Sequence, residues 1–80
     1  MDDKTCLFDI TMFKQAQLEY TIKQVYQALL ERGYDPVNQL VGYLTTGDPG
    51  YISNYKNARE IIQEMDRELL IAFLLEQYLQ

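Results

Sequence analysis

Two glycine and Asp-Pro breaks divide this chain into short helical segments and limit what it can fold into. The first is Gly33 followed by Asp35-Pro36, and the second is Gly47 followed by Asp48-Pro49. Glycine tolerates the left-handed conformation that ends a helix, aspartate caps the next helix, and proline fits its first position. The breaks predict one helix ending near residue 32, another running from Val37 to Gly47, and a turn or single helical turn around Tyr51.

Apolar residues recur at steps of three and four on both sides of these breaks, which is the spacing of one helix face. The first helix carries Leu18, Ile22, Val25, Tyr26, Leu29 and Leu30. A third helix is expected through Ala58, Ile61, Ile62 and Met65, and a last one through Leu69, Leu70, Phe73, Leu74 and Tyr78. We predict an all-α fold, a compact bundle of about four helices within residues 16–80.

Residues 1–15 have a different pattern. Cys6, Phe8, Ile10 and Met12 recur with a period of two, which is typical of extended backbone. A single strand cannot pair with itself, so it must dock on another surface. We therefore predict an extended N-terminal arm over residues 1–15, followed by the helical domain of residues 16–80.

The chain is short and lacks the usual covalent supports. It has 80 residues, one cysteine (Cys6) and no histidine, so it can form no internal disulfide and lacks the commonest zinc ligand. A chain of this size buries only about 60% of its unfolded surface. The last helix is apolar on most sides, which predicts burial against a second copy. We expect a homodimer with Leu70, Phe73 and Leu74 in its interface.

The charge argues against nucleic-acid and membrane partners. The formal net charge is −5, and the seven basic residues are dispersed among twelve acidic ones, whereas nucleic-acid binding depends on clustered Lys and Arg. The longest apolar run, 69–75, is far shorter than the roughly 20 residues of a membrane span. The N-terminus is acidic where a secretory signal would be basic. We expect a cytoplasmic protein; a helix-turn-helix DNA-binding regulator over the second and third helices is the weaker alternative, since only Arg59 and Gln63 suit base contacts.

Catalytic and cofactor sites are not expected. Without histidine, Ser-His and Cys-His nucleophile pairs are impossible. The glycines do not match a phosphate-binding loop, and the carboxylates near residues 60–68 fit a solvated helix face better than an acid–base pair. We predict a non-enzymatic protein with no metal and no cofactor.

Three features remain as candidates for function. Four tyrosines near the helix breaks are either core residues or an aromatic partner surface: Tyr34, Tyr43, Tyr51 and Tyr55. Gly42, inside the second helix, costs about 1 kcal/mol relative to alanine; we favour close packing over ligand contact as its role. Thr5, in a polar N-terminal segment, is the more accessible candidate for phosphorylation, with Thr11 as the second.

Two long sequence blocks resemble the IreB family of small regulatory phosphoproteins of low-GC Gram-positive bacteria. Residues 33–44 carry the block G-Y-x-P-x-N-Q-x-V-G-Y, and residues 47–52 carry G-D-P-x-Y-I. The resemblance extends to Asp3-Lys4-Thr5 with Phe8, to Asn57-Ala58-Arg59, to Asp66-Arg67-Glu68 and to Tyr78-Leu79. It therefore covers nearly the whole chain.

That resemblance implies a helical homodimer that is phosphorylated on an N-terminal threonine by a transmembrane Ser/Thr kinase with extracellular PASTA domains. A phosphatase reverses the modification, in a pathway that answers cell-envelope stress and affects resistance to cell-wall antibiotics. Thr5 matches the family's threonine motif, and Asp2 stands where some members have a second threonine. The resemblance supplies no downstream partner.

Overall fold

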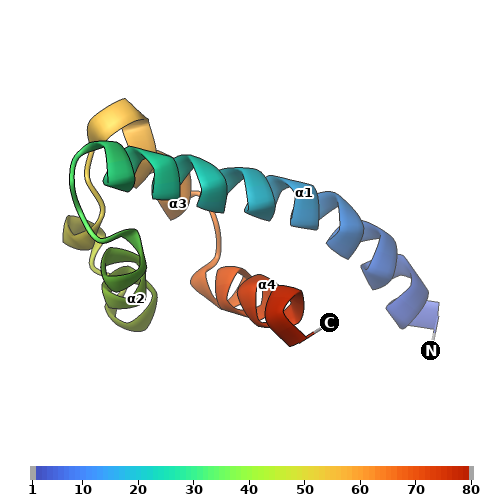
Figure 1. Ribbon diagram of the computed structural model, residues 1–80. Helices are drawn as coiled ribbons and strands as arrows, with labels where there is room; N and C mark the ends of the chain where they lie inside the picture. Colours follow the sequence, from blue (N-terminus) through green and yellow to red (C-terminus); the bar gives the residue numbers. More distant parts are fainter. Residues whose placement is uncertain (1, 80) are drawn as a thin grey trace.

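The computed structural model describes the backbone of residues 2–79 and the side chains of residues 14–79. Its elements are α1 (Asp2–Glu31), α2 (Pro36–Thr46), the 3-10 turns η1 (Pro49–Tyr51) and η2 (Tyr55–Asn57), α3 (Ala58–Gln63) and α4 (Arg67–Leu79). No strand occurs in residues 2–79. The expected all-α fold with four helices is confirmed (Figure 1).

Helix α1 determines the shape of the molecule. No glycine or proline precedes Gly33, so nothing interrupts its 30 residues, which at 1.5 Å per residue span about 45 Å. The longest dimension of the molecule is also 45 Å. Helix α2 lies beneath the C-terminal part of α1 and α4 beneath its middle, while the first turns of α1 project past the end of α4 (Figure 1).

The predicted extended arm is wrong, because α1 already begins at Asp2. A lone strand leaves its backbone groups unpaired, whereas a helix pairs them within the segment. No strand in residues 2–79 offers a partner, and no residue before Gly33 is a helix breaker. The use of residues 1–15 as a separate functional segment stays a prediction.

The breaks act as predicted. Helix α1 ends before Gly33, which has φ +83°. Asp35 caps α2 by accepting a hydrogen bond from the Asn38 backbone at 3.3 Å. At the other end of α2, Gly47 adopts φ +78° and donates its N–H to the Tyr43 carbonyl at 2.7 Å.

The core lies where the other elements meet one face of α1. Leu18, Val25 and Leu29 are buried along that face. The residues packed with them from later elements are Leu40, Tyr43, Ile52, Ala58, Ile62, Leu70 and Phe73. Burying one large aliphatic side chain contributes about 1.5–3 kcal/mol, so this single core fixes all four helices on one another.

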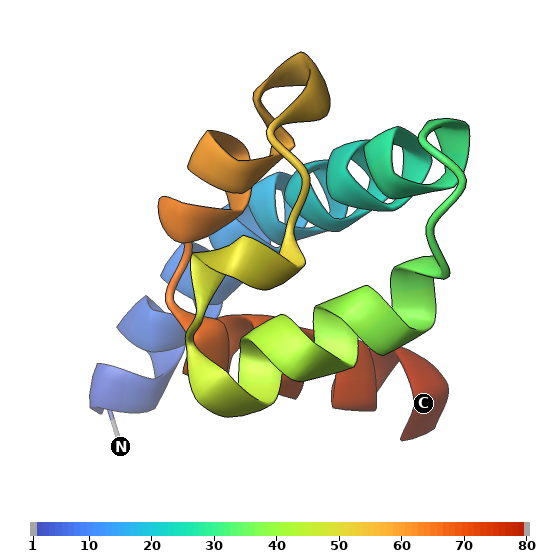
Figure 2. The same cartoon turned by 90° about the vertical axis from the view of Figure 1, so that its left-hand side faces the viewer.

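Helix α4 corrects the expected interface. Leu70 is fully buried and Phe73 is 7% exposed within the chain's own core, with Leu74 packed against it. Leu70 and Phe73 are therefore not exposed for contact with a second copy. Helices α2 and α4 lie on the same side of α1 in both views (Figures 1 and 2). Their exposed apolar residues are Val37, Val41, Leu69, Ile71, Leu75, Tyr78 and Leu79.

Candidate functional site

The candidate phosphorylation sites, Thr5 and Thr11, lie on the first three turns of α1. Their side chains fall outside the described residues. Thr5 precedes Lys14 by nine residues (14 − 5), or about 14 Å along the helix. Lys14 is the first residue of α1 that lines a groove.

A groove runs along α1 opposite the connection between α3 and α4. One half has a volume of about 480 Å³, and its residues are Lys14, Gln17, Leu18, Glu64, Met65, Asp66 and Leu69. The other half, about 450 Å³, shares Gln17, Glu64 and Met65 and continues to Tyr20 and Ile61. The groove forms because α3 stops at Gln63 and the chain turns away before α4 begins at Arg67.

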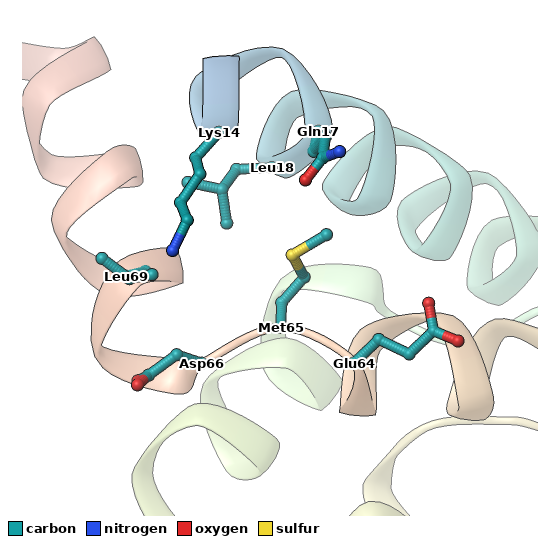
Figure 3. Close-up of a pocket in the computed structure, with 7 residues that line it drawn as sticks. All are labelled: Lys14, Gln17, Leu18, Glu64, Met65, Asp66 and Leu69. Carbon is teal, nitrogen blue, oxygen red and sulfur yellow. The ribbon is translucent and has the colours of Figure 1, made fainter. Parts of the chain in front are cut away.

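Figure 3 shows the side chains that line one half of the groove. Met65 points from the α3–α4 connection toward α1, with Leu18 and Gln17 opposite it, and Lys14 extends toward Leu69. Met65 is half-buried and unbranched, so it can adapt to different partners. The charged groups beside the apolar floor are one amine and two carboxylates, from Lys14, Glu64 and Asp66. An apolar floor with charged residues at its edge is the composition of a protein-binding surface. Sequence reasoning missed the groove because Leu18 and Met65 were assigned only to apolar helix faces.

The first sequence block, residues 33–44, builds a packed corner rather than a ligand site. A Cβ atom at Gly42 would lie 2.5 Å from Cε1 and 2.9 Å from Cγ of the Tyr51 ring. The Gln39 side-chain amide donates to the Tyr51 carbonyl at 2.9 Å. The preferred interpretation of Gly42, close packing, is therefore confirmed.

The second block, residues 47–52, joins α2 to α4. Asp48 caps η1 by accepting from the Gly50 backbone at 2.8 Å. The Arg67 guanidinium covers Gly47, where a Cβ would lie 2.8 Å from its central carbon. Arg67 also donates to the Leu44 carbonyl at 3.1 Å, which satisfies an otherwise unpaired group near the end of α2.

The four tyrosines do not share one role. Tyr43 is 4% exposed and belongs to the core, so its assignment to a partner surface is wrong. Tyr34 and Tyr51 are exposed, at 48% and 39%, and remain candidates for such a surface. Tyr55 is half-buried and packs against the core.

Tyr55 lies at a basic corner that we define by Arg32 and Lys56, and Arg59 follows in the first turn of α3. The Arg32 guanidinium carbon and the Lys56 amine lie 5.3 Å and 5.4 Å from the centre of the Tyr55 ring, within cation–π range. The Lys56 amine also lies 3.0 Å from the Glu31 carboxylate. Its hydrogen bond to Glu31 raises the pKa of Lys56, and the same bond lowers the pKa of Glu31.

The structure offers no support for the DNA-binding alternative. Helix α3, the expected recognition helix, has six residues, about 9 Å, and its exposed residues include Glu60. None of the helices in residues 2–79 combines the length and apolar composition that a bilayer-spanning helix requires. Among the side chains of residues 14–79, no three potential metal ligands come together.

Two comparisons bear on the identity of the chain. The family model described as IreB regulatory phosphoprotein matches residues 3–80. A protein of Ruminiclostridium cellulolyticum named UPF0297 protein is 42% identical over 78 residues, which cover 98% of this chain and 89% of that protein. Both matches include the two sequence blocks and the N-terminal segment with Thr5.

Proposed function

The chain belongs to the IreB family of regulatory phosphoproteins, and from this premise we propose that it is a non-enzymatic cytoplasmic regulator, phosphorylated on Thr5 by a PASTA-type Ser/Thr kinase. A partner phosphatase removes the phosphate. The pathway is signalling of cell-envelope stress that affects resistance to cell-wall antibiotics. The observation that carries the proposal is the family match over residues 3–80, which includes the threonine segment.

The position of Thr5 supports its role as acceptor. It lies on the first turns of α1, which project past α4 (Figure 1). Kinases act on extended backbone at accessible termini, and the ends of helices fray readily. Thr11 lies nearly two turns further into the helix, so opening it requires unwinding more residues.

The groove offers a docking site for the downstream partner close to the phosphorylated segment. It begins at Lys14, about 14 Å along α1 from Thr5, and combines the apolar floor of Leu18 and Met65 with charged rims. A protein seated there lies next to the N-terminal turns of α1. The unidentified downstream partner therefore binds differently to the two states of Thr5.

The homodimer is the second part of the proposal. Val41 is 52% exposed on α2 and Leu75 is 54% exposed on α4. Leu44 and Ile71 line one hollow between these two helices together with the charged residues Asp66, Arg67 and Glu68, so one apolar residue of each helix borders it. Exposed apolar surface of this kind marks association sites, and it replaces Leu70 and Phe73 as the candidate interface.

The kinase experiment tests the central claim. The full-length protein is incubated with the kinase domain and ATP, and its intact mass is measured beside Thr5→Ala and Thr11→Ala. We expect one phosphate on the wild type and on Thr11→Ala, and none on Thr5→Ala. Phosphate retained in Thr5→Ala moves the site, and no phosphate on any variant refutes the kinase-substrate role.

Sedimentation velocity tests the dimer. Val41→Glu and Leu75→Glu introduce charge into the proposed interface and should convert the protein to monomers. Lys23→Glu is the control, because Lys23 is exposed and pairs only with Glu19 on the same helix. A wild type that is monomeric at high concentration refutes the dimer, and unchanged dimers in both interface variants refute this interface.

A further inference from the structure

The basic corner places two cations, Arg32 and Lys56, over one aromatic ring, that of Tyr55. Lys23 is paired with Glu19. Lys14 shares the groove with Glu64 and Asp66. At the corner, Arg32 and Lys56 both lie against the Tyr55 ring; Lys56 pairs with the carboxylate of Glu31, and within residues 14–79 Arg32 has no ion-pair partner.

The corner is also presented for binding. The Lys56 side chain is 61% exposed, and Arg32 is exposed at the end of α1. Arg59 is anchored by its Nε–H, which donates to the Ile52 carbonyl at 2.9 Å, so its position is fixed. Exposed ion pairs such as Lys56–Glu31 are weak, and a stronger anion can therefore take over the lysine.

The N-terminal segment of this family member carries the complementary charge. Asp2 and Asp3 are the only adjacent pair of acidic residues in the chain. Phosphorylation of Thr5 adds about −1.5 to −2 charges and three acceptor oxygens at pH 7. Arginine and lysine clusters bind such groups by charge-assisted hydrogen bonds.

We propose that the basic corner of one copy binds the phosphorylated N-terminal segment, Asp2-Asp3-Lys4-phospho-Thr5, of a second copy. The segment cannot come from the same chain, because Thr5 and Arg32 are 27 residues (32 − 5) apart on one continuous helix, or about 40 Å. The proposal rests on Thr5 phosphorylation as proposed above. It makes phosphorylation a switch of contacts between copies.

A synthetic peptide of residues 2–13, with and without phosphate on Thr5, is titrated into the full-length protein by isothermal calorimetry. We expect the phosphopeptide to bind at least tenfold more tightly, with an affinity that falls as salt is raised. Arg32→Gln and Lys56→Gln should each weaken it at least fivefold. Lys23→Gln, which removes one exposed cation elsewhere on α1, should change it less than twofold.

Amide shift mapping by NMR on the wild type locates the peptide without any variant, and the shifts should centre on residues 54–59. Equal binding of both peptides, equal losses in Lys23→Gln and Arg32→Gln, or shifts centred on the groove overturn the inference. The peptide is synthesised with its phosphate, so failure here leaves the kinase result standing. Failure of the kinase to modify Thr5 refutes the proposed function without touching the measured affinity.

Discussion

The effect of Gly42→Ala on the free energy of unfolding should depend in sign on which residue occupies position 51. In an open helix, Gly→Ala stabilises by about 1 kcal/mol. Here the new methyl group overlaps the Tyr51 ring, with 2.9 Å to Cγ, so rotating the ring about its own axis does not relieve the overlap. Overpacking costs about 1–3 kcal/mol. The net effect of Gly42→Ala in the wild type is therefore a loss of about 1 kcal/mol.

In Tyr51→Ala the overlap disappears, and Gly42→Ala should then stabilise by about 1 kcal/mol. The coupling energy between the two positions is about 2 kcal/mol, within the range measured for residues in contact. Urea unfolding followed by far-UV circular dichroism, at one fixed protein concentration, gives the four stabilities. Gly33→Ala is the matched control: no atom crowds its Cβ, and its φ of +83° makes it equally destabilising in both backgrounds. Stabilisation by Gly42→Ala in the wild type would refute the packing argument.

Three further predictions concern residues at the ends of α1 and α4. Arg67→Ala should lower the free energy of unfolding by about 1 kcal/mol in urea denaturation, because the Leu44 carbonyl loses its donor; equal stability would contradict this. Glu31→Gln should be less stable than the wild type at neutral pH, with a gap that closes in acid: the pKa of Glu31 is lowered by Lys56 in the folded state, so its contribution is present above the unfolded pKa and is lost as pH falls through the folded one. Thermal melts across pH 3–7 test it, and a gap constant with pH would contradict it. A peptide of residues 2–20 should gain helicity by circular dichroism when Thr5 is phosphorylated, and unchanged or lower helicity would contradict this.

Helix ends were predictable because their causes are local. Gly33, Asp35, Gly47 and Asp48 act through their own backbone conformation and through caps within three residues. Such chemistry can be inferred from a short stretch of sequence. The packing role of Gly42 was predictable for a similar reason, since a glycine inside a helix is costly unless something lies close to it.

Contacts between distant elements were not predictable in the same way. The pattern of α4 showed that it is apolar on most sides, but not which face meets α1. The structure buries Leu70 and Phe73 in the chain's own core and leaves Leu75 exposed. Tyr43 likewise faces the core rather than a partner. The groove depends on where α3 stops relative to Leu18, about 45 residues earlier in the chain.

The helical start of α1 decides how phosphorylation of Thr5 should act on the N-terminal segment. On an extended arm, added charge beside Asp2 and Asp3 would mainly repel and undock the segment. The helix begins at Asp2, so Thr5 belongs to its first turn, where unpaired N–H groups and the positive end of the helix dipole favour negative charge. A negative group there stabilises a helix by about 0.3–1 kcal/mol, and 1 kcal/mol changes a population ratio about fivefold. If the proposed function holds, we therefore expect the kinase to act on an unwound N-terminal turn of α1 and its product to favour the helix.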